Sequence, residues 1–178
     1  VYRGADMGLH AEVSTMPWDC AVTHDSAEKV AIRCWVRTYR TPFFFEKTLT
    51  LNSGSPVLEI EEALVNEGEE PVHCVWGQHI ALGSPFLSED CVIDLPGGRL
   101  FNHPDEWDPN NRLKAGFEGS WPWSDAKDGG PIDLSKVPPR AARAYDMSYI
   151  TDMPEGWYAI TNQRMGLGFG VVFPKDLF

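Results

Sequence analysis

The residues best suited to chemistry lie in the segment Trp76-Gly77-Gln78-His79. An imidazole gives and takes protons near neutral pH, so His79 is a candidate general acid or base. The amide of Gln78 offers a donor and an acceptor side by side, which complements the vicinal hydroxyl groups of a sugar. The indole of Trp76 offers a flat apolar face for the C–H side of a pyranose ring. The segment therefore predicts contacts to a sugar, with a structural histidine as the alternative.

A second candidate is the segment Gly8-Leu9-His10-Ala11-Glu12, which is followed by Trp18. If this segment is a strand, the side chains of His10 and Glu12 point to the same face. That placement predicts a cluster that binds sugar hydroxyls or transfers a proton. The alternative is an exposed terminal strand without a ligand.

Metal and cofactor chemistry find little support in the sequence. His73 and His79 would share one strand face, and Cys74 or His103 could join them, but this spacing matches no standard zinc pattern. The sequence contains neither a P-loop nor a G-x-S-x-G motif. We therefore expect no bound metal and no cofactor.

The first half of the chain shows the two-residue alternation of β-strands. Apolar and polar residues alternate over residues 29–39, 43–51, 57–66 and 72–80, and Gly, Asn and Pro clusters separate these runs. In the last run, alternation places His79 with Gly77 and His73, and it places Trp76 and Gln78 on the opposite face. Short connections between consecutive strands predict an antiparallel meander.

The second half is less regular. Residues 82–139 are rich in Pro and Gly and predict long loops with a few short strands, which carry Trp107, Trp121 and Trp123. Strand patterns return at residues 145–151, 157–161 and 167–173, and no helical periodicity is evident. The sequence predicts an all-β fold that forms a single domain over residues 1–178.

Charge and cysteine content restrict the partners. The 178 residues include 15 basic and 26 acidic side chains, and the net charge of −11 repels phosphate backbones and anionic lipids. A neutral or a cationic ligand is compatible with this charge, and we expect neither nucleic acid nor a membrane as partner. The four cysteines are widely spaced and predict buried free thiols in a reducing cytoplasm, with disulfides as the alternative.

The ends of the sequence predict a fragment. The sequence begins Val-Tyr-Arg-Gly, without an initiator Met, and it ends within an apolar β pattern. Since a truncated sheet exposes the edges of its strands, we expect the chain to pair with another copy of itself.

Several segments, taken in order, resemble the aldose 1-epimerase (galactose mutarotase) superfamily, and more closely its uncharacterised aldose-epimerase-like branch. The resemblance covers nearly the whole chain and depends on the order of individually weak motifs. These are Leu9-His10-Ala11-Glu12 with Trp18, the strand pair from Thr48 to Gly68, Gln78-His79 with Gly83-Ser84-Pro85-Phe86, and the late strand pair from Tyr149 to Asn162.

The resemblance implies a two-sheet antiparallel β-sandwich with an open cleft for a monosaccharide or small glycan. The sandwich is incomplete if the chain is a fragment. It implies that His79 is the general acid that protonates the ring oxygen, and that His10 hydrogen-bonds the sugar. Asp146 would match the ring-binding aspartate of the family. The ring then opens, the C1–C2 bond rotates, and reclosure gives the other anomer.

Three differences from the family pattern leave the activity open. Ala11-Glu12 replaces two glycines, so that Glu12 either narrows the cleft or contacts the sugar, and Gln78 replaces an asparagine. The glutamate base of the family lies beyond the point where this sequence stops, and no glutamate follows Glu155. A mutarotase-type isomerase and a non-catalytic carbohydrate-binding or accessory sandwich domain are therefore both retained. The sugar and its phosphorylation state are not specified by the sequence.

Overall fold

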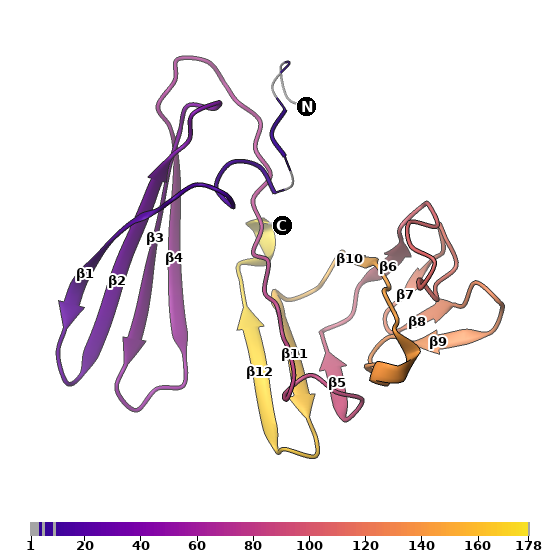
Figure 1. Cartoon of the computed structure of the whole chain (residues 1–178). Coiled ribbons are helices and arrows are strands. Elements are labelled where there is room, and N and C mark those ends of the chain that lie inside the picture. Colours follow the sequence, from indigo (N-terminus) through magenta and orange to yellow (C-terminus); the bar gives the residue numbers. More distant parts are fainter. Residues whose placement is uncertain (1–3, 5, 9, 178) are drawn as a thin grey trace. The chain divides into compact units, whose positions relative to one another are not determined.

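The computed structural model describes residues 4, 6–8 and 10–177 (Figure 1). The chain forms two compact units, Val1–Gln78 and His79–Phe178. The predicted all-β fold class is confirmed, because the strands form antiparallel sheets of the kind that build β-sandwiches and the described residues contain no α-helix. That residues 1–178 form a single domain stays a prediction.

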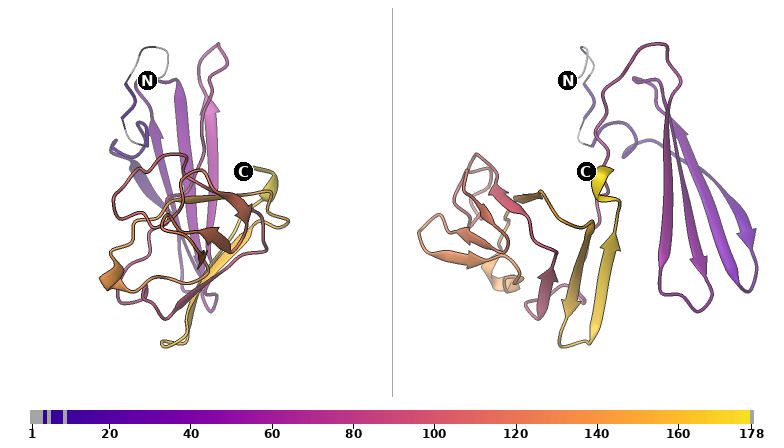
Figure 2. Two further views of the ribbon diagram at one scale, coloured as in Figure 1. Left: turned by 90° about the vertical axis from the view of Figure 1, so that its right-hand side faces the viewer. Right: turned by 180° about the vertical axis from the view of Figure 1, so that it is seen from behind.

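The first unit contains one four-stranded antiparallel sheet in the order β1-β2-β3-β4. Both views in Figure 2 show its long strands running side by side (indigo to magenta). The predicted meander over residues 29–66 is confirmed. The strands are β1 (Asp19–Asp25), β2 (Lys29–Arg37), β3 (Phe43–Asn52) and β4 (Leu58–Asn66).

The pairing register fixes which side chains share a face of this sheet. Cys20 lies opposite Cys34, Cys34 opposite Lys47, and Lys47 opposite Glu62, so these four residues form one row across all four strands. On both sides of this row the same face carries apolar side chains, which are Val22, Ile32, Leu49 and Ile60 on one side and Val36, Phe45 and Leu64 on the other. We call this surface the Glu62 face.

The second unit is built from short strands, as the sequence predicts for residues 82–139. Its sheets have the orders β10-β6-β7, β12-β11-β5 and β8-β9. Cys91, Leu100 and Leu113 form its buried apolar core. The elements are β5 (Cys91–Asp94), β6 (Arg99–Asn102), β7 (Glu118–Ser120), β8 (Trp123–Asp125), β9 (Pro131–Asp133), the 3₁₀ helix η1 (Arg140–Ala142), β10 (Ser148–Thr151), β11 (Trp157–Asn162), β12 (Leu167–Val172) and the 3₁₀ helix η2 (Lys175–Leu177).

Two strand predictions are wrong. Residues 72–80 pair in no ladder of the described chain, and Val75 in this segment is fully exposed, because the alternation alone does not supply a neighbouring strand. Residues 10–15 form a turn in which His10 and Ala11 have φ values of 58° and 56°, so the shared strand face of His10 and Glu12 does not exist. Leu9 of this motif lies outside the described residues.

The prediction of four buried thiols is also incorrect. Cys91 is buried, Cys34 is half-buried, and Cys20 and Cys74 are exposed. Cys20 is exposed because it lies on β1, the edge strand of the sheet, and Cys74 because its segment pairs with no described strand.

Candidate functional site

The carboxylate of Glu62 lies on the strand β4 and contacts three other side chains of the first unit. Leu58, Ile60, Glu62 and Leu64 share one face of β4, so the charge lies on an otherwise apolar stripe. Only 10% of the Glu62 side chain is exposed. Burying a charge is costly unless it has a partner, and the opposite residue on β3 supplies one. Lys47 Nζ lies 3.2 Å from Glu62 Oε1 and forms an ion pair with it.

Two residues predicted to bind a sugar meet at the second oxygen of Glu62. Trp76 Nε1 donates a hydrogen bond to Oε2 at 2.8 Å, and Gln78 Nε2 donates to the same oxygen at 2.6 Å. The two side chains therefore lie on one side of their segment, as the alternation predicts. Hydrogen bonds to an ionised acceptor are the stronger class, so this carboxylate holds the indole and the amide in place.

Aromatic rings surround the ion pair. The Trp18 and Phe45 ring centroids lie 5.2 Å apart, and those of Phe45 and Trp76 lie 5.7 Å apart, both edge to face. Lys47 Nζ lies 5.2 Å from the centroid of Trp18 and 5.6 Å from that of Phe45, within the range of cation–π attraction. These six residues are called the Glu62 cluster below, and they are Trp18, Phe45, Lys47, Glu62, Trp76 and Gln78.

Two members of the cluster are exposed to solvent. Gln78 is exposed, and 39% of Trp76 is accessible to solvent although its N–H is bound to Glu62. The cluster thus offers a partly exposed indole and an exposed amide, while the carboxylate of Glu62 is engaged by Lys47, Trp76 and Gln78.

The two histidines predicted to be catalytic are both exposed. His79 directly follows Gln78 and opens the second unit, and His10 lies in the turn at the start of the first unit. Because His79 is exposed, a small molecule can reach its side chain. Their joint action on one ligand stays a prediction.

Glu12 anchors a turn of the first unit. Its Oε1 accepts hydrogen bonds from the backbone N–H groups of Tyr39 (2.9 Å) and Arg40 (2.8 Å), and its Oε2 accepts from the Thr41 backbone N–H and hydroxyl. Burial of the carboxylate raises its pKa, but the hydrogen bonds outweigh this effect and the pKa lies below its ordinary value. A hollow of about 210 Å³ lies beside it, lined by Met7, Glu12, Thr15, Met16, Tyr39 and Arg40. Sugar contact by Glu12 stays a prediction.

The lowered pKa of Glu12 predicts a pH-dependent contribution to stability. The folded state binds the proton of the Glu12 carboxyl group less tightly than the unfolded state does. The ionised carboxylate therefore stabilises the fold above its ordinary pKa of about 4.3. This stabilisation is lost as the pH falls through the lower pKa that Glu12 has in the folded state. Glu12→Gln should lower the free energy of unfolding by about 1 to 3 kcal/mol at pH 7. Urea unfolding at several pH values should show this difference shrinking below about pH 4. The matched control is Glu28→Gln, an exposed glutamate; an equal effect of both variants would contradict the anchoring role.

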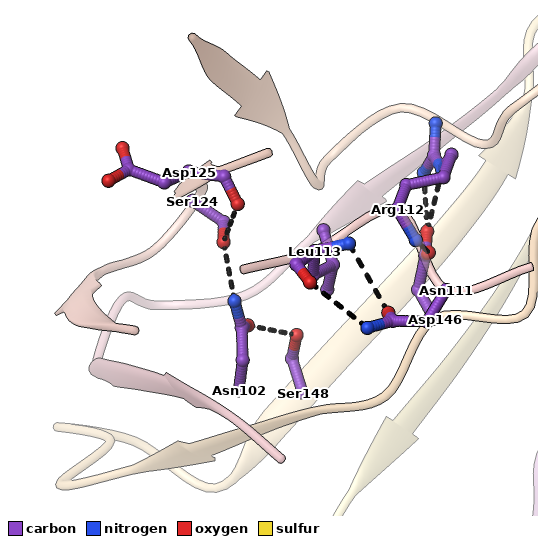
Figure 3. Close-up of polar contacts among 8 residues, drawn as sticks. All are labelled: Asn102, Asn111, Arg112, Leu113, Ser124, Asp125, Asp146 and Ser148. Carbon is purple, nitrogen blue, oxygen red and sulfur yellow. Dashed lines mark hydrogen bonds and ion pairs between the residues drawn. The ribbon is translucent and has the colours of Figure 1, made fainter. Parts of the chain in front are cut away.

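Asp146 is held by Arg112 in the second unit (Figure 3). The guanidinium donates two hydrogen bonds to Asp146 Oδ2, and the backbone N–H of Arg112 donates to Oδ1 at 2.9 Å. The side chain of Asp146 is 18% exposed. These contacts join the 111–113 segment to the chain before β10. A contact of Asp146 with a sugar ring stays a prediction.

Sequence reasoning missed Glu62 and Lys47, although a signal was present. Each is a charged residue at an apolar position of an alternating strand, Glu62 after Leu58 and Ile60, and Lys47 between Phe45 and Leu49. Isolated charges at such positions pair with each other when the strands are neighbours. The pairing register was the missing information.

Within residues 4, 6–8 and 10–177, no three His, Cys, Asp or Glu side chains are grouped so that they could hold a metal ion. In the same part of the chain, no helix is long and apolar enough to cross a membrane.

Comparison of the whole sequence and structure with models of protein families, with curated proteins and with solved structures finds no match.

Proposed function

We propose that the chain binds a neutral monosaccharide or small glycan at the Glu62 cluster. The observation that carries this proposal is the double hydrogen bond from Trp76 and Gln78 to Glu62 Oε2, which fixes an indole and an amide next to each other. The partly exposed indole would stack on the C–H face of the sugar ring. The amide of Gln78 would bind the hydroxyl groups, since it has a second N–H and a carbonyl oxygen.

The charge distribution supports a neutral ligand. Two arginines of the four-stranded sheet are already paired, Arg33 with Glu46 and Arg37 with Glu67. Arg33 and Arg37 also lie on the sheet face opposite to that of Cys34 and Lys47. The only cation of the Glu62 cluster, Lys47, is paired with Glu62 itself. The cluster therefore offers no uncompensated positive charge to a sugar phosphate.

Binding is tested by titrating the full chain with unmodified aldoses, galactose and glucose first, and following ligand saturation-transfer NMR. Trp76→Ala should weaken the interaction at least about tenfold, equivalent to about 1.4 kcal/mol. The matched control is Trp123→Ala, which removes an indole of the second unit that is 54% exposed. Absence of binding to any aldose would refute the proposal. A loss caused by Trp123→Ala but not by Trp76→Ala would place the site at β8 of the second unit.

The activity proposed with binding is interconversion of sugar anomers with His79 as general acid and His10 as a hydrogen-bond donor to the sugar. It is supported by the family resemblance and by the position of the exposed His79 next to Gln78 in the chain. A positioned acid contributes roughly 10²- to 10⁴-fold in rate. NMR exchange spectroscopy between the two anomers of a bound aldose should therefore show a loss of that order in His79→Ala. Binding with only the spontaneous exchange rate would instead identify a non-catalytic carbohydrate-binding domain.

A further inference from the structure

Two cysteines lie directly opposite each other on neighbouring strands of the first unit. Cys20 of β1 and Cys34 of β2 are partners in the antiparallel register and belong to the Glu62 face. Opposite residues of an antiparallel pair have Cα atoms about 4.5 to 5.5 Å apart. A disulfide spans Cα distances of about 4.4 to 6.8 Å. Both thiols are free in the structure. The antiparallel register therefore places the two Cα atoms within the range that a disulfide can bridge.

We propose that Cys20 and Cys34 form a cross-strand dithiol that undergoes reversible thiol–disulfide exchange with a small-molecule disulfide such as glutathione disulfide. The exchange does not require a bound sugar. The pair differs from the other two cysteines, because Cys91 is buried and Cys74 belongs to a segment that pairs with no described strand.

The surroundings of the two thiols indicate which one attacks first. Cys20 is exposed and can be reached by a disulfide in solution, whereas Cys34 is half-buried. A hydrogen bond with Cys20, burial and the charge of Cys20 raise the pKa of Cys34, while the ammonium group of Lys47 opposes them. The thiolate is the nucleophile. Cys20 is therefore the attacking thiol and Cys34 the resolving one.

The exchange proceeds in two balanced steps. The Cys20 thiolate attacks one sulfur of glutathione disulfide, which forms a mixed disulfide on Cys20 and releases one glutathione thiolate. The Cys34 thiolate then attacks the Cys20 sulfur, which closes the protein disulfide and releases the second glutathione. The protons of both cysteines are transferred to the two glutathione thiolates, and the protein is oxidised by two electrons.

The test treats the full chain with glutathione disulfide, quenches it with an alkylating agent and maps the peptides by mass spectrometry. Wild type should lose the mass of two hydrogens and yield a linked peptide pair that joins residues 19–25 to residues 29–37. Cys34→Ser should retain one glutathione on Cys20, because the resolving thiol is gone. Cys74→Ser, a matched change of an exposed cysteine, should leave the linked pair unchanged.

Two results would overturn the proposal. One is a wild-type chain that accumulates glutathione on Cys20 without forming the link to Cys34. The other is a link that forms as fast in urea-unfolded chain as in folded chain, since the sheet would then contribute nothing to the pairing. Reduced glutathione in excess should reopen the link, and a link that persists would exclude reversible exchange.

Discussion

Replacing Asn102 with alanine should lower the free energy of unfolding of the second unit by about 3 kcal/mol. The side chain of Asn102 is buried, with 3% exposed, and joins three segments of the chain (Figure 3). Its Nδ2 donates to the Lys114 carbonyl at 2.9 Å and to Ser124 Oγ at 2.8 Å, and its Oδ1 accepts from Ser148 Oγ at 2.7 Å. Each lost bond costs about 1 kcal/mol, and buried partners left unsatisfied cost more.

The measurement is urea unfolding of the full chain combined with hydrogen exchange of the peptides that contain β6 and β10. Protection of the backbone amides of β6 and β10 against hydrogen exchange should fall. Asn102 ends β6, Ser148 begins β10, and the hydrogen bond between their side chains would be lost. Asn110→Ala is the matched control, since Asn110 is an exposed asparagine in the same loop region. Its effect should stay within about 0.5 kcal/mol. Equal effects of the two variants would show that the Asn102 contacts do not stabilise this unit.

The long strands of the first unit could be predicted from the sequence because their alternation is strict. In β2, Ile32 and Val36 alternate with Arg33 and Arg37, and the observed bounds differ from the predicted ones only at the ends. Asn52 and Asn66 mark the ends of β3 and β4, next to the turns that the sequence indicates. A two-residue period across nine or ten residues is hard to explain by any structure other than a β-strand.

Other parts of the fold depend on pairing, which alternation does not specify. The segment that contains Val75 has a strand-like pattern but no ladder partner, whereas β1 begins and ends with aspartate and forms a strand because β2 lies beside it. The three-residue strands β7, β8 and β9 are too short to produce a periodic signal. The presence or absence of a neighbouring strand decided the structure in each of these cases.

The candidate site was predicted in part. Trp76 and Gln78 were recognised from their chemistry, and their common side followed from alternation. Glu62, which orients both, required the knowledge that residues 76–78 lie against β4. The role of Glu12 was likewise hidden, because its four hydrogen bonds go to residues 39–41, which are distant in sequence.

Lys47→Met should destabilise the first unit by about 2 kcal/mol, because it leaves the carboxylate of Glu62 without its cation. Breaking a fully buried ion pair costs about 3 to 5 kcal/mol. The cost is smaller here because 27% of the Lys47 side chain is exposed and Trp76 and Gln78 still donate to Glu62. Urea unfolding measures the change. Lys29→Met, which removes an exposed lysine of β2, is the control and should stay within about 0.5 kcal/mol.

The double variant Lys47→Met, Glu62→Leu separates stability from binding. Two apolar side chains would then replace the ion pair on an apolar face, so the stability lost in Lys47→Met should largely return. Trp76 and Gln78 would nevertheless lose their shared acceptor, and aldose binding should fall at least about tenfold, equivalent to about 1.4 kcal/mol. A double variant that regains stability and binds as wild type does would show that Glu62 serves folding alone. A variant that stays folded but loses binding identifies Glu62 as the residue that positions the sugar-binding groups.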